Sequence, residues 1–324
     1  MSQQALRTTE LTEQEYSVSA DVDEILEGLG RPEKALSPKF FYDERGSKLF
    51  DAICELPEYY PTRTELSIMR THIDQITALV GPQASLIEFG SGSSLKTRML
   101  LENLDQLAAY VPVEISRKHL MKAARSLAAD FPDVEVWPVL ADFMQPFDLP
   151  NPSVMPIRNV VYFPGSTIGN FSPEEAHSLL QVMHVEAGKD GALLIGVDLR
   201  KDKGVIERAY NDSAGITAEF NLNMLARINR EFGANFNLEL FRHHAQYNEE
   251  HGRIEMYLIS ACAQIVGIGG RSIHFEKGDA LLTEHSHKYT LDQFSNMARR
   301  AGFVVDAVWT DPEQLFSVQY CLRI

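Results

Sequence analysis

Short apolar runs and amphipathic segments alternate between Ser85 and Leu199. Five runs rich in β-branched and aromatic residues predict strands: SLIEFG, YVPVEIS, VEVWPVL, RNVVYFPGS and GALLIGVDL. Segments with apolar residues at helical spacing lie between most of them, namely LKTRMLLENL, RKHLMKAARSLAADF and PEEAHSLLQVMHVEA. Strands that alternate with helices form a parallel sheet through right-handed crossovers. The pattern therefore predicts a doubly wound α/β domain.

The alternation stops after Leu199. Residues 204–232 predict a pair of helices, and residues 244–266 predict a hairpin whose turn is EEHG. A helix over LDQFSNMARRAG and two strands, FVVDAVWT and LFSVQYCLRI, then resume the first pattern. We therefore expect residues 200–286 to be an insertion late in the doubly wound domain.

Composition narrows the class of protein. A chain of 324 residues exceeds what one hydrophobic core usually organises, which favours one large domain with a second, smaller one. The net charge of −15 repels phosphate backbones and anionic lipid surfaces. We therefore expect a small-molecule substrate, and no nucleic-acid or membrane partner.

The chain also lacks the usual targeting and cysteine signals. Its first residues have no basic start followed by an apolar run, and no apolar stretch is long enough to span a bilayer. Cys54, Cys262 and Cys321 lie far apart and outside any CxxC pattern, which argues against a disulfide framework or a zinc site. The expectation is a cytoplasmic protein, which we take to be a monomer.

The stretch IEFGSGSSLKTR contains the first candidate binding residues. Glu88, Gly90 and Gly92 lie where the first predicted strand ends and a helix begins. Glycine lets a ligand approach the backbone, and a helix N-terminus offers unpaired N–H groups. The third glycine of the dinucleotide fingerprint is missing, which weakens the case for a nicotinamide-dependent dehydrogenase.

Two further acids follow the next two predicted strands. Glu114 ends the second, where an acid commonly binds ribose hydroxyls. Asp142, with Phe143 beside it, follows the third, where adenine would need an acceptor and an apolar face. Together with Glu88 these acids suit S-adenosylmethionine, which has ribose, adenine and a positive centre. The alternative is that each acid only caps a helix.

Six sequence blocks resemble one family: the S-adenosylmethionine-dependent histidine Nα-methyltransferases of ergothioneine biosynthesis. They are KFFYDERGSKLFDAICELPEYYPTRTE, EFGSGSSLKTRMLL, FPGSTIGN, AYNDSAGITAEFN, RIEMYL and LLTEHSHKY. The resemblance implies a class I methyltransferase domain (Rossmann-like) formed by residues 65–199 and 287–324. It implies a smaller α+β substrate domain formed by residues 1–64 and 200–286.

The resemblance also implies roles for individual residues. It assigns cofactor binding to Tyr42, Gly90, Lys96, Glu114, Asp142 and Phe143, although the family carries aspartate where Glu114 stands. It assigns histidine binding to Tyr59, Gly165, Asn170, Tyr210, Met256, Glu284 and Ser286. Tyr42 and Tyr59 are the candidates for removing the ammonium proton, with ordered water as the alternative. The implied product is Nα,Nα,Nα-trimethylhistidine (hercynine).

The segment LLTEHSHK contains the residues expected to select histidine as the substrate. In an extended segment Glu284 and Ser286 share one face while His285 and His287 share the other. A carboxylate and a hydroxyl on one face can hold an imidazole ring. The two histidines alone make a weak metal site, so we expect no metal. Taken without the resemblance, Asn170 also fits a turn before a helix, and Met256 fits the core.

Three other functions compete with histidine methylation. An enzyme with the same fold could act on another aromatic amino acid such as tryptophan, but indole has no basic nitrogen to match Glu284. A non-catalytic S-adenosylmethionine-binding module would not need the pocket residues. A nucleic-acid amino-methyltransferase is disfavoured because FPGSTIGN lacks the Asn/Asp-Pro-Pro-aromatic pattern.

Overall fold

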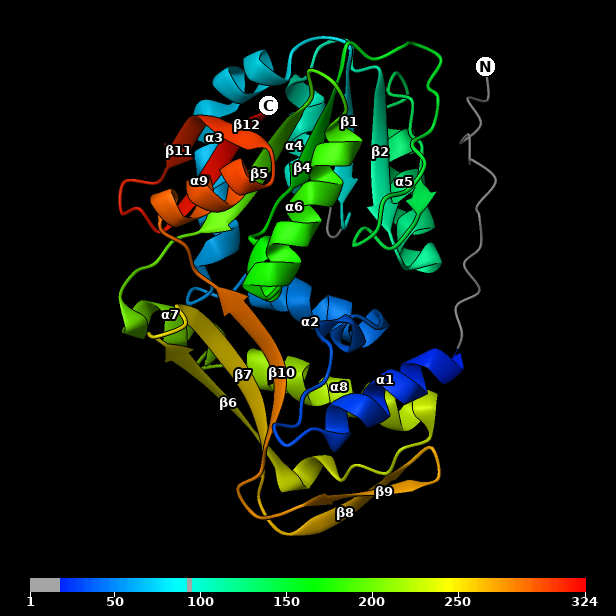
Figure 1. Cartoon of the computed structure of the whole chain (residues 1–324), viewed down its shortest axis with the longest axis vertical. Coiled ribbons are helices and arrows are strands. Elements are labelled where there is room, and N and C mark those ends of the chain that lie inside the picture. Colours follow the sequence, from blue (N-terminus) through cyan, green and yellow to red (C-terminus); the bar gives the residue numbers. More distant parts are fainter. Residues whose placement is uncertain (1–17, 92–94) are drawn as a thin grey trace. The chain divides into compact units, whose positions relative to one another are not determined.

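The computed structural model describes residues 18–91 and 95–324, which form two compact units. One unit contains Thr64–Leu199 and Tyr289–Ile324, and the other contains residues 18–63 and Arg200–Lys288. The first is built on a seven-stranded sheet, the second on a three-stranded sheet and a two-stranded hairpin (Figure 1). Assigning the cofactor to the first unit and the substrate to the second remains a prediction.

The seven-stranded sheet has the strand order β11-β12-β5-β4-β1-β2-β3. Its strands are β1 (Ala84–Phe89), β2 (Ala109–Glu114), β3 (Val139–Leu140), β4 (Arg158–Phe163), β5 (Ala192–Asp198), β11 (Phe303–Thr310) and β12 (Phe316–Arg323). Strands β1 to β5 pair in parallel, whereas β12 runs antiparallel to both of its neighbours. The chain order reverses at β1, so the predicted doubly wound α/β fold is confirmed.

Helices cover both faces of this sheet. One apolar core joins the sheet to α3 (Tyr60–Val80), α4 (Leu95–Asn103) and α5 (Arg117–Asp130), and the other joins it to α6 (Pro173–Ala187) and α9 (Leu291–Arg300). Within β4, Val160 and Tyr162 enter the first core while Val161 and Phe163 enter the second. Strands buried on both faces read as continuous apolar runs, which is why these runs were visible in the sequence.

The second unit is α+β and combines two distant segments. Its antiparallel sheet has the order β10-β7-β6. The N-terminal segment supplies α1 (Val18–Gly30), η1 (Pro38–Phe41) and α2 (Glu44–Cys54); the later segment supplies α7 (Lys203–Tyr210), α8 (Ile216–Phe232), η3 (Leu238–Leu240), β6 (Phe241–Asn248), β7 (Arg253–Ser260) and β10 (Ala280–His287). The rings of Phe41 and Phe220 stack with centroids 4.4 Å apart. The two segments therefore share one core.

Two local predictions needed correction. The predicted strand VEVWPVL is regular only at Val139–Leu140, because Pro138 has no N–H to donate to a neighbouring strand. The predicted hairpin does turn at residues 249–252, but the later part of its second run forms a separate strand, β8 (Gln264–Ile268). This strand pairs with β9 (Arg271–Phe275), which the sequence analysis missed.

Candidate functional site

Gly90 and Phe143 lie together at the carboxyl end of β1. Gly90 has a φ of +77°, a conformation that favours glycine, and a Cβ at this position would lie 3.8 Å from the Phe143 ring. Phe143 stacks on Phe89, the last residue of β1, with ring centroids 5.6 Å apart. The chain after β3 thus returns to the first glycine turn, whereas Gly92 lies outside the described residues.

Glu114 and Asp142 both cap their own turns. Oε1 of Glu114 accepts hydrogen bonds from the N–H groups of Ile115 (2.9 Å) and Ser116 (3.2 Å). Oδ1 of Asp142 accepts one from Met144 N–H at 2.9 Å. Burial raises the pKa of Glu114, and the two backbone hydrogen bonds oppose that shift. Each cap involves one carboxylate oxygen, so capping leaves the second oxygen for a ligand hydroxyl or amine.

Glu88, at the end of the first strand, has a structural role. It is buried, and its two carboxyl oxygens accept hydrogen bonds from Thr97 Oγ1 at 2.8 Å and from the Tyr110 hydroxyl. Burial raises the pKa of Glu88 to about 7, although both donors oppose the shift. Glu88 therefore ties β1 to α4 and β2, and a ligand would meet two acids at this edge of the sheet.

Lys96 and Gly165 are joined by Glu65, an acid that is not among the predicted site residues. The Lys96 ammonium contacts the carboxylate of Glu65, and the Gly165 N–H donates to the same carboxylate at 3.0 Å. Glu65 is 1% exposed. It is the last residue of the stretch LPEYYPTRTE, whose charged positions were a visible signal. The carboxylate thus fastens the start of α4 to the loop after β4.

Glu284 and Ser286 share the buried face of β10. Glu284 lies opposite Met256 of β7, and Ser286 lies opposite Ile254. The strand has a bulge between Leu282 and Glu284, and the residues after the bulge alternate regularly between the two faces. Burial raises the pKa of Glu284 to about 7. The predicted extended segment is therefore present, and the structure pairs it with the strand that contains Met256.

Tyr59 and Tyr210 accompany Glu284 in the second unit. Their ring centroids lie 6.0 Å apart in an edge-to-face arrangement, and both side chains are buried. Burial, reinforced by Tyr210, Cys54 and Glu284, raises the pKa of Tyr59 well above its usual value. Tyr59 therefore keeps its proton at neutral pH, so it suits hydrogen bonding or proton relay better than resting as a phenolate base.

Tyr42 lies directly after η1 among aromatic rings. Its ring centroid is 5.9 Å from that of Phe50 and 5.9 Å from that of Phe220. The side chain is 38% exposed. Contacts along its apolar edges therefore fix the ring, while part of its surface is open to a ligand.

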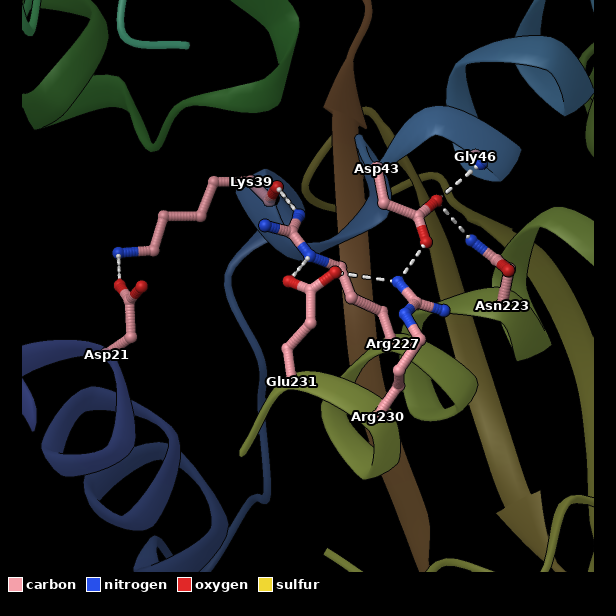
Figure 2. A network of polar contacts seen from close by, with 8 residues as sticks. All are labelled: Asp21, Lys39, Asp43, Gly46, Asn223, Arg227, Arg230 and Glu231. Carbon is pink, nitrogen blue, oxygen red and sulfur yellow. Dashed lines mark hydrogen bonds and ion pairs between the residues drawn. The ribbon is translucent and has the colours of Figure 1, made fainter. Parts of the chain in front are cut away.

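The backbone beside Tyr42 is fixed by a polar network around Asp43 (Figure 2). One carboxylate oxygen accepts from Gly46 N–H at 2.6 Å, which caps α2, and from Asn223 at 2.9 Å; the other accepts from Arg230 at 2.6 Å. Burial alone would raise the pKa of Asp43, but these hydrogen bonds lower it. Asp43 therefore stays ionised and links α2 to α8.

Lys288 is a second buried charged residue that the sequence analysis missed. Its ammonium donates to the Tyr210 hydroxyl at 3.0 Å and to Ser286 Oγ at 2.9 Å. The signal was available, because Lys288 continues the alternation of Glu284 and Ser286 by two residues. The second unit thus brings together Tyr59, Tyr210, Met256, Glu284, Ser286 and Lys288.

The remaining predicted residues belong to the first unit. Gly165 lies in the loop after β4 with a φ of +79°, and Asn170 ends η2 (Thr167–Asn170). The predicted histidine-binding residues are therefore distributed over both units. Over residues 18–91 and 95–324, no cluster of three His, Cys, Asp or Glu side chains could hold a metal ion. None of the helices described is long and apolar enough to cross a membrane.

Comparison with known proteins identifies relatives over nearly the whole chain. A family model described as histidine-specific methyltransferase, SAM-dependent, matches residues 21–323. The histidine N-alpha-methyltransferase of Mycolicibacterium smegmatis is 39% identical over 91% of this chain and 92% of its own length. The enzyme of the same name from Mycobacterium tuberculosis is 37% identical, covering 89% and 90%. Ergothioneine biosynthesis protein 1 of Neurospora crassa is 30% identical over 86% of this chain and 32% of its own length.

Proposed function

The chain belongs to the family of histidine-specific, S-adenosylmethionine-dependent methyltransferases, and we propose that it methylates the α-amino group of L-histidine. Up to three transfers would give Nα,Nα,Nα-trimethylhistidine for ergothioneine biosynthesis. The names of the two mycobacterial relatives support the position of methylation, and the name of the fungal relative supports the pathway.

The residues at the carboxyl edge of the seven-stranded sheet fit S-adenosylmethionine. Gly90 leaves room beside the backbone, Glu114 offers an acceptor to the ribose hydroxyls, and Asp142 with Phe143 offers an acceptor and an apolar face to adenine. The bound cofactor supplies a methyl group activated by a positive sulfur. Tyr42 and Lys96 complete the proposed cofactor set.

The residues of the proposed histidine pocket suit two polar parts of the amino acid, its carboxylate and its ring. By the resemblance, Asn170 and Tyr210 would be neutral donors for the carboxylate, and Gly165 would belong to the same set. Glu284 and Ser286 would bind the two ring nitrogens, one as acceptor and one as donor. Tyr59 and Met256 form the walls. Every polar group of a ligand buried in such a pocket needs a partner, because an unpaired one would oppose binding.

The chemistry needs positioning more than covalent help. A neutral amine held in line with the methyl carbon displaces the sulfide, and orientation supplies most of the effect. The nitrogen must then lose a proton to water or to a nearby side chain before the next transfer. Tyr59 suits relay of that proton, since burial keeps it protonated at rest, and Tyr42 is the second candidate.

The main support for histidine as the substrate is that Glu284 and Ser286 share one buried face of β10. Mass spectrometry of reactions with S-adenosylmethionine and either histidine, tryptophan, phenylalanine or tyrosine tests it. Mass gains of one to three methyl groups on histidine alone are expected. Methylation of tryptophan in preference to histidine would favour the alternative substrate, and binding of the cofactor without any product would favour a non-catalytic module.

We also propose that the enzyme works in the cytoplasm as a monomer, without a metal and without nucleic-acid or membrane partners. The acidic net charge of −15 supports the last two points. Full activity in the presence of a chelator and a monomeric mass in solution are the expected results. Loss of activity on chelation would contradict the proposed independence from metal.

A further inference from the structure

Lys288 places a buried ammonium group against two hydroxyls of the proposed histidine pocket. The residue is 2% exposed, and its Nζ lies 3.0 Å from the Tyr210 hydroxyl and 2.9 Å from Ser286 Oγ. The same nitrogen lies 5.0 Å from the centre of the Tyr210 ring. The proposed function uses both hydroxyls but gives the lysine no part.

The main chain holds Lys288 in place from two sides. Its N–H donates to Gly252 O at 2.8 Å, and its carbonyl accepts from Arg200 Nε at 3.2 Å. A Cβ at Gly252 would lie 2.1 Å from the Arg200 guanidinium, so glycine makes room for this contact. The position of the ammonium is therefore fixed by backbone contacts as well as by its own hydrogen bonds.

An ammonium group can only donate hydrogen bonds, and this decides what the two hydroxyls can do. A hydroxyl has one hydrogen and two lone pairs. Because Tyr210 and Ser286 both accept from Lys288, the hydrogen of each hydroxyl is directed to some other acceptor. Two groups that could otherwise accept or donate are thereby biased toward donation.

We propose that Lys288 is a positioning residue that determines the selectivity for histidine. It makes the Tyr210 hydroxyl a donor to the substrate carboxylate and the Ser286 hydroxyl a donor to the unprotonated ring nitrogen. Glu284 then accepts from the ring N–H. An indole offers an N–H but no ring lone pair in its plane, so the Ser286 hydrogen would be left without an acceptor. This inference rests on the proposed function and concerns the same pocket.

The charge of Lys288 also acts on Glu284. Burial raises the pKa of Glu284, and Lys288 opposes that rise. Tyr59 also interacts electrostatically with Glu284, and its own high pKa keeps it neutral. Removal of the ammonium should therefore raise the pKa of Glu284 further and move the pH dependence of histidine binding upward. Simple loss of packing would not shift that profile in a defined direction.

Lys201 provides a matched control in the same unit. Its ammonium donates to the Tyr60 hydroxyl at 2.6 Å and lies 4.3 Å from the centre of the Tyr60 ring, so the lysine and tyrosine pair is of the same kind. Neither residue belongs to the proposed pocket. Lys288→Met and Lys201→Met would remove the same group from two lysine–tyrosine pairs, of which the first is buried and the second partly buried.

The test measures kcat/KM for histidine and tryptophan, and the Kd for histidine with S-adenosylhomocysteine present, for wild type and both variants from pH 6 to about pH 9. In Lys288→Met, histidine kcat/KM should fall about 10- to 100-fold, as expected for losing charge-assisted hydrogen bonds. The ratio of histidine to tryptophan turnover should fall with it, and histidine binding should need a higher pH. Lys201→Met should keep the wild-type ratio and profile.

A double-mutant cycle with Ser286→Ala separates positioning from folding. If Lys288 acts through Ser286, the loss in Lys288→Met/Ser286→Ala should be smaller than the product of the single losses. An unchanged substrate ratio and pH profile in folded Lys288→Met, or fully multiplicative losses, would overturn the inference. If wild type failed to methylate histidine, the proposed function itself would be overturned, together with this inference.

Discussion

The Lys96 ammonium contacts the carboxylate of Glu65, and the two residues lie 31 positions apart in the chain. Glu65 also accepts from the Gly165 N–H at 3.0 Å. A Cβ at Gly196 of β5 would lie 2.1 Å from Glu65 Oε1, so this glycine leaves the space in which the carboxylate lies. One buried acid thus organises a proposed cofactor residue and a proposed substrate residue.

Replacing Glu65 should weaken both stability and cofactor binding. Glu65→Ala leaves Lys96 and the Gly165 N–H without their shared acceptor, which should lower the free energy of unfolding by roughly 3–5 kcal/mol. Glu65→Gln keeps one acceptor and should cost less. Urea unfolding and calorimetry with S-adenosylmethionine measure the two effects. Glu27→Ala, which breaks an exposed pair with Arg31, should change stability by less than about 1 kcal/mol. Equal losses for the two alanine variants would show that the buried pair has no special role.

Glu114 should contribute to cofactor affinity through its charged acceptor. Glu114→Ala removes a carboxylate proposed to bind the ribose hydroxyls, so the Kd for S-adenosylmethionine should rise about 10- to 150-fold, or roughly 1.5–3 kcal/mol. Glu186→Ala is a suitable control, because Glu186 is also a buried acid of the first unit and accepts from Phe147 N–H at 3.2 Å. Unchanged calorimetric affinity in folded Glu114→Ala would refute this assignment.

We expect Glu284 to determine the specificity among aromatic amino acids. Glu284→Ala removes the proposed acceptor for the imidazole N–H while leaving Asn170 and Tyr210 for the carboxylate. Histidine kcat/KM should fall about 10- to 150-fold. Glu284→Leu combined with a smaller residue at Met256, which lies opposite on β7, should raise tryptophan turnover. The ratio of histidine to tryptophan turnover is the quantity to compare, and a ratio that stays constant would place specificity elsewhere.

The stability of the enzyme should depend on pH through Glu284. Burial raises its pKa from 4.5 to about 7, so the folded chain binds this proton more tightly than the unfolded chain. The stabilisation is complete below pH 4.5 and is lost as pH rises to about 7. Glu284→Gln should therefore gain stability relative to wild type across this range, by up to about 3 kcal/mol at pH 8. Chemical unfolding at pH 5 and pH 8 measures the difference.

Glu255→Gln should show the opposite sign. Burial alone would raise the pKa of Glu255, but hydrogen bonds from Arg253 and Tyr257 lower it. Its stabilisation is therefore present above the unfolded pKa and is lost as pH falls through the folded pKa. The glutamine variant should be less stable than wild type at pH 8, and this deficit should shrink in acid. The same trend in both variants would contradict the environments described for these carboxyls.

The layers of the first unit follow from the order of its amino acids alone. Strands covered by helices on both faces must be apolar on both faces, so runs such as RNVVYFPGS stood out as strands. The same order also places Glu284 and Ser286 on one face, because the period of an extended chain is two residues. Both features depend only on residues close together in the chain, so the amino-acid sequence is sufficient to predict them.

The contacts between groups far apart in the chain depend on the three-dimensional fold. Glu65 reaches Gly165 across 100 positions, and Lys288 reaches Tyr210 across 78. Such pairs depend on strand order and loop paths, which the pattern of apolar residues does not encode. The structure likewise distinguished Glu114 and Asp142, each of which accepts backbone hydrogen bonds with one carboxylate oxygen, from Glu88, both of whose oxygens accept from Thr97 and Tyr110. In the sequence, these three carboxylates at strand ends look alike. Their roles differ because each role depends on the hydrogen-bond donors that the fold places beside the carboxylate.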